Sequence, residues 1–280
     1  MIPELLLCCD LDRTLIPNGP QLLSDQAMPC LRRLVSRPEV KLAFVTGRSQ
    51  HLVERAIARW DLPTPDYVAG DVGTTIYDVG PAATWKPWDT WDLAIGTDWH
   101  GHTHADLKAA LAGIPDLRLQ GEDSQGRFKL SYTAPADLDT GSTLRALGSR
   151  LEALGVAAEV IWSVDETIPL GLVDVVPKSA TKQGAVEFIR SRLDVPPTHT
   201  VFAGDSGNDL PVLAGPLKAI LVANATPEVR TQARHLAEIA GKTSDLYLAE
   251  GGYRGMNGNY AAGILEGVIH FFPEAEEWIG

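Results

Sequence analysis

The chain has 280 residues, 45% of them hydrophobic and 21% charged, which is typical of a soluble globular protein with about two domains. Its formal net charge of -12 argues against nucleic acid or an anionic membrane as the main partner, because phosphate contacts are made by clusters of Lys and Arg. The three cysteines, including adjacent Cys8 and Cys9, have neither a disulfide nor a metal spacing, and no apolar run is long enough to span a membrane. We therefore expect an untargeted cytoplasmic protein.

Four apolar runs that end in polar turns predict the strands of a parallel sheet. They cover residues 5–9, 41–49, 200–213 and 218–229. Helical patterns follow the second and the fourth run, with Ser49 as candidate N-cap of one helix and Pro227 near the start of the other. Strands that alternate with helices predict a doubly wound, Rossmann-like α/β core. In such sheets the ligand lies outside the carboxyl ends of the strands.

The pattern changes between residues 82 and 172. Four tryptophans fall in a stretch that reads as rich in loops: Trp85, Trp88, Trp91 and Trp99. A strand, an amphipathic helix and a second strand are then predicted over residues 127–134, 143–155 and 156–164. We interpret residues 82–172 as an inserted α+β cap domain, and residues 1–81 and 173–280 as a discontinuous core domain.

Carboxylates stand at the ends of two predicted strands. Asp10 and Asp12 directly follow the first strand, and such a pair suits phosphoryl transfer, in which one carboxylate attacks phosphorus and the other handles the leaving group's proton. A solvated turn would give the same spacing, so this pair alone decides nothing. The sequence GDSGND adds Asp205 and Asp209 on a glycine-rich turn. Carboxylates from two strand ends can hold Mg²⁺, which prefers oxygen ligands.

Two further features indicate a phosphate site. Thr46, with the backbone amides of Gly47 and Arg48, opens a predicted helix whose positive end can receive phosphate oxygens. Lys182 lies in the first turn of another predicted helix and could neutralise phosphoryl charge, although the sequence leaves the choice between Lys178 and Lys182 open.

The motifs DLDRTL, TGRS, Lys182 and GDSGND, in this order, resemble those of the haloacid dehalogenase superfamily. Within it, the blocks PDYVAGDVGTTIYD, RFKLSY, ILVANATPEV and YAAGILEGVIHFF resemble the sucrose-phosphate phosphatase family over nearly the whole chain. The resemblance implies that Asp10 forms an aspartyl phosphate. It also implies that Asp12 protonates the departing sugar oxygen and later deprotonates the attacking water.

The resemblance further implies a ligand set. Mg²⁺ would be held by Asp10, the backbone carbonyl of Asp12 and Asp205, with Asp209 as a further ligand or as support. The phosphoryl oxygens would be held by Thr46, Gly47, Lys182 and Asn208, and candidate substrate-binding residues are Arg48 and Lys129. Two departures bear on this: residues 162–177 form a longer segment than in the family, and Gln183 separates Lys182 from the glycine that usually follows it.

These observations favour a Mg²⁺-dependent phosphatase that hydrolyses a phosphorylated sugar or disaccharide, in the first place sucrose 6-phosphate, as a monomer. Other glycosyl phosphates of the mannosylfructose or glucosylglycerol type stay open, as do a phosphomutase and a non-catalytic sugar-phosphate-binding module. The alternating His100, His102 and His104 would suit a metal site on a strand, but a solvated cap loop is the favoured interpretation.

Overall fold

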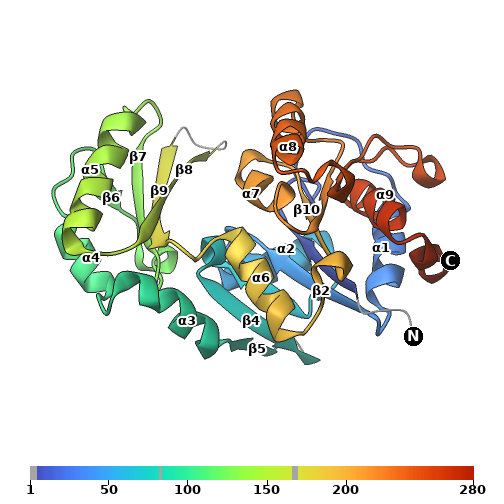
Figure 1. The fold of residues 1–280 in the computed structure, drawn as a ribbon, viewed down its shortest axis with the longest axis horizontal. Coiled ribbons are helices and arrows are strands. Elements are labelled where there is room, and N and C mark those ends of the chain that lie inside the picture. The colour runs from blue at the N-terminus through green and yellow to red at the C-terminus, as the bar shows by residue number, and fades with distance from the viewer. Residues whose placement is uncertain (1–4, 82–83, 166–169) are drawn as a thin grey trace. The chain divides into compact units, whose positions relative to one another are not determined.

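The computed structural model describes residues 5–81, 84–165 and 170–280. Within these residues, no helix is both long enough and apolar enough to cross a membrane. The chain divides into two compact units (Figure 1). The first unit comprises Met1–Gly70, Ile76–Lys86 and Lys182–Gly280, and the second comprises Asp71–Thr75 and Pro87–Thr181.

The first unit is built on an eight-stranded sheet with the strand order β12-β11-β10-β1-β2-β3-β4-β5. The strands are β1 (Leu5–Cys9), β2 (Val40–Val45), β3 (Tyr67–Gly70), β4 (Thr75–Gly80), β5 (Thr84–Pro87), β10 (Thr200–Gly204), β11 (Lys218–Leu221) and β12 (Leu246–Leu248). The pairs from β12 through β3 are all parallel. The predicted α/β core with its parallel sheet is confirmed, and β1, β2, β10 and β11 correspond to the four predicted apolar runs.

The strand order reverses direction at the pair formed by β1 and β10. From β1 the chain moves to β2 and β3 on one side, whereas β10, β11 and β12 succeed one another on the other side. Loops that leave two such strands diverge and open a crevice at their carboxyl ends, which is where ligands bind in sheets of this kind. Asp10 follows β1 and Asp205 follows β10, so both polar turns begin at this crevice.

Helices cover the sheet, and its central strands are buried on both faces. The helices of this unit are α1 (Ala27–Val35), α2 (Gln50–Trp60), α6 (Lys182–Arg192), α7 (Leu210–Leu213), α8 (Pro227–Ile239), α9 (Ala261–Phe271) and α10 (Glu276–Ile279). Alternate residues of β1, such as Leu5 and Leu7, share one apolar cluster with α1 and α9. Each such leucine stabilises the fold by about 1.5–3 kcal/mol.

Helix α2 differs in detail from the prediction. Ser49 occupies its N-cap position, but the Ser49 side chain makes no capping hydrogen bond. The helix buries Val53 and Ala56 against the core, whereas Leu52 is 42% exposed. One turn of this helix therefore presents an apolar side chain to its outer face.

The second unit has its own four-stranded antiparallel sheet, in the order β6-β7-β9-β8. The strands are β6 (Arg118–Leu119), β7 (Leu130–Pro135), β8 (Ala158–Asp165) and β9 (Leu170–Pro177), and the helices are α3 (Asp89–Gly96), α4 (His104–Ala110) and α5 (Thr140–Leu154). Leu147 and Leu151 of α5 pack into this unit's core, and Gly155 ends the helix with a φ of 76°.

Two features of residues 82–177 differ from the sequence interpretation. The tryptophan-rich stretch is not a loop, because Trp85 lies in β5 and Trp91 in α3. The expected boundary between residues 172 and 173 falls inside β9, which runs on to Pro177 because it pairs with β7 and β8 over its length. For the three histidines the alternative of a metal site on a strand face is excluded, because His104 begins α4. Residues 166–169 of the longer segment lie outside the described residues.

Candidate active site

Three buried carboxylates converge beyond the carboxyl ends of β1 and β10. Asp10, Asp205 and Asp209 each offer an oxygen, and these oxygens lie within 4.8 Å of one another. All three residues are at most 6% exposed. Within the described residues this is the one cluster of His, Cys, Asp or Glu side chains with the spacing of a metal site.

Lys182 supplies the positive charge that this cluster needs. Its Nζ donates to Asp10 Oδ1 at 2.7 Å, to Asp209 Oδ1 at 2.7 Å and to Asn208 Oδ1 at 3.2 Å. The lysine is 8% exposed and stands at the first position of α6, as predicted, whereas Lys178 is exposed. The geometry thus decides between the two candidate lysines in favour of Lys182.

One ammonium group does not balance three buried carboxylates, and the pKa values of Asp10 and Asp205 are raised. Burial raises the pKa of Asp10 to about 7, because the opposing charge of Lys182 offsets desolvation only in part. Burial and the charge of Asp209 raise the pKa of Asp205 to about 6. Burial alone would lower the pKa of Lys182, but Asp10 and Asp209 outweigh it and raise that pKa. The cluster therefore favours a further cation.

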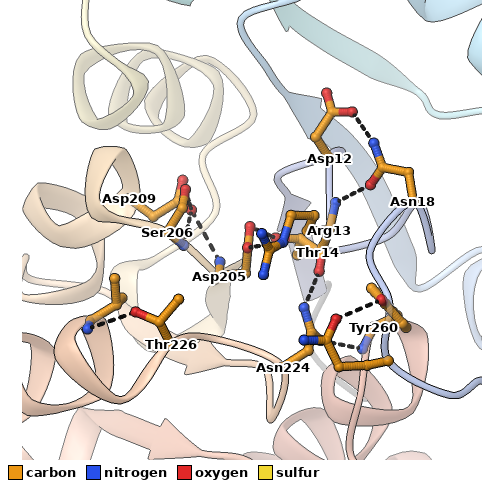
Figure 2. A network of polar contacts seen from close by, with 12 residues as sticks. Asp12, Arg13, Thr14, Asn18, Asp205, Ser206, Asp209, Asn224, Thr226 and Tyr260 are labelled. Carbon is orange, nitrogen blue, oxygen red and sulfur yellow. Dashed lines mark hydrogen bonds and ion pairs between the residues drawn. The ribbon is translucent and has the colours of Figure 1, made fainter. Parts of the chain in front are cut away.

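Asp12 lies outside this cluster and has different partners. Arg48 Nε donates to Asp12 Oδ2 at 2.7 Å and Arg48 Nη2 to Asp12 Oδ1 at 2.6 Å, a bidentate pair, while Asn18 Nδ2 donates to Oδ1 at 2.7 Å. Figure 2 shows the contact between Asp12 and Asn18. Partial burial would raise the pKa of Asp12, but the hydrogen bonds and charge of Arg48 outweigh burial and hold it below its usual range.

Asp209 is held by hydrogen bonds on both of its oxygens. Oδ1 accepts from Lys182, and Oδ2 accepts from the backbone amides of Asp205 and Ser206, both at 3.1 Å. This carboxylate packs so close to Gly204 that a Cβ there would lie 2.6 Å from its Cγ. Gly204, the first glycine of GDSGND, is therefore required where the chain passes Asp209. The side chain is fully buried and engaged, which suits a support role.

The loop after Asp12 contains contacts that sequence reasoning missed (Figure 2). Thr14 Oγ1 donates to Asp205 Oδ1 at 3.0 Å, and Arg13 Nε lies 3.6 Å from Asp205 Oδ2. Arg13 has a φ of 61°, and its carbonyl accepts from Asn224 Nδ2 at 2.6 Å. Asn224 Oδ1 in turn accepts from the amide of Tyr260 at 2.9 Å. Both Arg13 and Thr14 lie in the motif DLDRTL. No local pattern, however, identifies Asn224 as the partner of the Arg13 carbonyl.

The predicted phosphate-binding residues of the second motif lie at the end of β2. Thr46 is buried, and its Oγ1 accepts from the amide of Arg48 at 3.2 Å. Gly47 is exposed, and no heavy atom lies within 4 Å of where its Cβ would be. Open backbone next to a helix start is the geometry in which amides can receive an anion. Arg48, a predicted substrate-binding residue, is paired with Asp12.

Lys129, the other predicted substrate-binding residue, belongs to the second unit and has its own cluster there. It is 8% exposed, and its Nζ lies 3.7 Å from Asp71 Oδ1 and 4.0 Å from Asp174 Oδ1. Ser131 Oγ donates to the same Asp174 carboxylate. Burial raises the pKa of Asp71, although the charge of Lys129 opposes this. The sequence patterns do not identify Asp71, Ser131 or Asp174 as candidate site residues.

A divalent cation fits the first cluster by the chemistry of its donors. Asp10 and Asp205 each offer a carboxylate oxygen, and these oxygens lie within 4.8 Å of each other; hard cations such as Mg²⁺ are bound through one or two carboxylates. Burial in the first place, and the neighbouring carboxylates in the second, raise the pKa values of Asp10 and Asp205, and a bound cation would favour their ionised forms.

Comparison with known proteins places these residues in a family. The sequence model of the sucrose-6F-phosphate phosphohydrolase family matches residues 3–272. A protein of Nitrosococcus oceani described as a HAD-like hydrolase is 50% identical over 280 residues, which cover all of this chain and 75% of that protein. The mannosylfructose-phosphate phosphatase of Agrobacterium fabrum is 27% identical over 82% of this chain and 87% of its own.

A longer relative and a solved structure are also similar to this chain over most of its length. Sucrose-phosphatase 1 of Nicotiana tabacum is 27% identical over 96% of this chain, which spans 59% of the tobacco protein. The sucrose-phosphatase of Synechocystis, solved in complex with sucrose and phosphate, superposes with a TM-score of 0.72 at 26% identity and covers 96% of this chain and 98% of its own.

Proposed function

This chain belongs to the sucrose-6F-phosphate phosphohydrolase family and is a HAD-type sugar phosphatase, and we propose that it hydrolyses sucrose 6-phosphate to sucrose and inorganic phosphate. The observation that carries the proposal is the position of Asp10 at the end of β1. Lys182 holds one oxygen of Asp10, Asp205 stands beside it, and Asp12 follows two residues later with separate partners.

In the proposed mechanism Asp10 is the nucleophile. Lys182 fixes Asp10 Oδ1, so that Oδ2 is the oxygen that attacks phosphorus and forms the aspartyl phosphate. The phosphorus–oxygen bond to the sugar breaks as the new bond forms, and the sugar oxygen takes a proton from Asp12. Asp12 then takes a proton from the water that cleaves the aspartyl phosphate.

Arg48 and Asn18 set the starting state of Asp12. Because they hold its pKa below the usual range, Asp12 is ionised in the resting protein and is ready for the second step, in which it acts as a base. The proton for the sugar oxygen must therefore be taken up before the first step, from solvent or with the substrate's phosphate.

The phosphoryl oxygens are proposed to bind between the second and fourth motifs. Thr46 Oγ1 and the amide of Gly47 can donate from the end of β2, and Lys182 can neutralise charge from α6. Asn208 uses Oδ1 for its contacts with Lys182 and Ser206, which leaves its amide nitrogen as the donor for phosphate.

Mg²⁺ is the proposed cofactor, held by Asp10, the Asp12 carbonyl and Asp205. When bound, it would stabilise negative charge on the phosphoryl oxygens. Since both oxygens of Asp209 already accept hydrogen bonds from the chain, we assign Asp209 to orienting Lys182 and the loop at Asp205.

The second unit is proposed to be the cap that reads the sugar. Lys129 is buried between the partly buried Asp71 and Asp174, and both ion pairs are longer than hydrogen bonds, so a sugar hydroxyl could interact with the charged groups of this cluster. A second candidate substrate is mannosylfructose phosphate, because the chain matches most of a phosphatase with that name.

The test is release of inorganic phosphate from sucrose 6-phosphate, mannosylfructose phosphate, glucosylglycerol phosphate, trehalose phosphate and glucose 6-phosphate, with Mg²⁺ and with EDTA. We expect the highest kcat/KM on sucrose 6-phosphate and no release in EDTA. Asp10→Asn should abolish release, because the amide is not a nucleophile. Normal turnover in that variant would overturn the mechanism, and a different best substrate would overturn the assignment of sucrose 6-phosphate.

Phosphate returned to another hydroxyl of the sugar, with none released, would identify a phosphomutase instead. Binding of sucrose 6-phosphate with no metal-dependent release would identify a non-catalytic binding module.

A further inference from the structure

An open groove of about 560 Å³ lies in the first unit along the outer face of α2. Three arginines and an asparagine line it: Arg48, Arg55, Arg59 and Asn18. Arg55 and Arg59 are four residues apart on the helix and so lie on one face, and both are exposed. Neither forms an ion pair with any carboxylate that the structure describes, and no carboxylate is among the groove's described lining residues.

The charge in this groove stands out against the rest of the chain. The protein carries 36 acidic and 24 basic residues, yet three arginines line this groove. Arg48 is paired with Asp12, whereas Arg55 and Arg59 form no ion pair with a carboxylate that the structure describes. Like charges that are gathered in a concave surface repel one another, and binding an anion removes that cost. Guanidinium groups present paired N–H donors that match phosphate and carboxylate oxygens.

The floor of the groove is apolar. Leu52, which α2 leaves 42% exposed, Ala56 and the ring of Trp60 line it. The Arg59 guanidinium carbon lies 5.4 Å from the centroid of the Trp60 ring. A flat aromatic surface beside a cation suits a ligand with a ring as well as a negative group. The volume lies in the usual range for small-molecule sites, about 300–1,000 Å³.

We propose that this groove binds a small organic phosphate, with its phosphate group on Arg55 and Arg59 and its ring against Trp60. Such a ligand is a sugar phosphate or a mononucleotide, which share this chemistry. The site is separate from the reacting phosphate, which the proposed mechanism places on Thr46, Gly47 and Lys182.

The groove is connected to the catalytic loop through two of its lining residues. Arg48 and Asn18 both line it and both donate hydrogen bonds to Asp12. The two side chains that hold Asp12 therefore line the same groove as Arg55 and Arg59.

The test uses this 280-residue chain without metal, so that binding is measured without turnover. Glucose 6-phosphate and adenosine 5′-monophosphate are titrated by calorimetry, with inorganic phosphate as the probe for the ion alone. The variant is Arg55→Gln with Arg59→Gln. The matched control, Arg192→Gln with Arg234→Gln, removes two exposed arginines from α6 and α8 and changes the net charge equally. Circular dichroism and thermal unfolding check that both variants fold.

We expect the groove variant to weaken binding of at least one organic phosphate by about tenfold or more, because two charge-assisted hydrogen bonds are lost, while the control binds as wild type does. Stronger loss for one probe tells a sugar phosphate from a mononucleotide. Wild-type affinity of the groove variant for both organic probes would overturn the proposal. It would also be overturned if the control lost as much affinity, or if inorganic phosphate lost as much as the organic probes.

Discussion

Each of the two units buries one lysine between two carboxylates, and the spacing differs. In the first unit Lys182 lies 2.7 Å from both Asp10 and Asp209, whereas in the second Lys129 lies 3.7 Å and 4.0 Å from its two partners. Short contacts fix a charge in one place, which phosphoryl transfer needs because the groups must be oriented before reaction. Long contacts leave room for hydroxyl oxygens to enter. We propose that the tightly held Lys182 serves phosphoryl transfer and that the loosely held Lys129 serves sugar recognition.

The largest effect is expected from the tightly held lysine. Lys182→Met leaves Asp10 and Asp209 without their cation, and kcat for sucrose 6-phosphate should fall by roughly a thousandfold. Steady-state phosphate release measures this. Lys182→Arg, which keeps the charge, distinguishes lost chemistry from lost folding when both variants are compared by circular dichroism. A fall of less than tenfold in the folded methionine variant would contradict the fixed-charge role.

The loosely held lysine should act on recognition instead. Lys129→Met should raise KM for sucrose 6-phosphate by about tenfold, since one hydrogen bond to a charged group is lost. It should leave hydrolysis of p-nitrophenyl phosphate, which has no sugar, unchanged. The matched control is Lys108→Met, an exposed lysine of α4 in the same unit. If Lys129→Met slowed both substrates equally, the contrast between the two lysines would be lost.

Stability should respond to pH in a way that reports on the first cluster. Because burial raises the pKa values of Asp10 and Asp205 to about 7 and 6, their protonated forms favour the folded state. That contribution is fully present below the ordinary carboxyl pKa and is lost as pH rises through about 6 to 7. A bound divalent cation offsets the loss. The increase in Tm on adding Mg²⁺ should therefore be larger at pH 8 than at pH 5, as calorimetry can check, and an equal increase would count against the site.

The smallest effect is expected on the ionisation of Asp12, the proposed acid and base. Removing the bidentate partner in Arg48→Gln lets the pKa of Asp12 rise, so the step that needs ionised Asp12 should begin at higher pH. The acidic limb of the pH profile for p-nitrophenyl phosphate should move upward by roughly a few tenths of a unit to one unit. Arg192→Gln, on α6, is the control. An unmoved limb would show that Arg48 does not set the ionisation of Asp12.

The sequence predicted the first unit better than the second for a physical reason. The apolar runs that form β1, β2, β10 and β11 are local patterns, and parallel strands bring their carboxyl ends to one edge. Asp10 and Asp205 could therefore be placed together from the residue pattern alone. Lys182 could be placed on its helix, but only its burial and its contacts in the folded chain excluded Lys178.

The partners of Lys129 depend on pairing between distant strands. Ser131 and Asp174 are opposite each other in the register of β7 with β9, which is set by contacts 43 residues apart in sequence. Local patterns did not identify Asn224 either, because it donates to the Arg13 carbonyl from 211 residues away in sequence. The sequence predicted the range of α2 correctly. Which of its side chains face outward depends on packing against the core, so the sequence alone did not predict it.

The central claim is that Asp10 carries the phosphoryl group. In Asp12→Ala the base that activates water is absent, so p-nitrophenyl phosphate, whose leaving group needs little protonation, should load the nucleophile faster than water clears it. Rapid acid quench followed by mass spectrometry should then show one added phosphoryl group on the peptide that contains Asp10, and none in Asp10→Asn with Asp12→Ala. A phosphoryl group on any other residue, or substrate turnover with none on Asp10, would contradict the account.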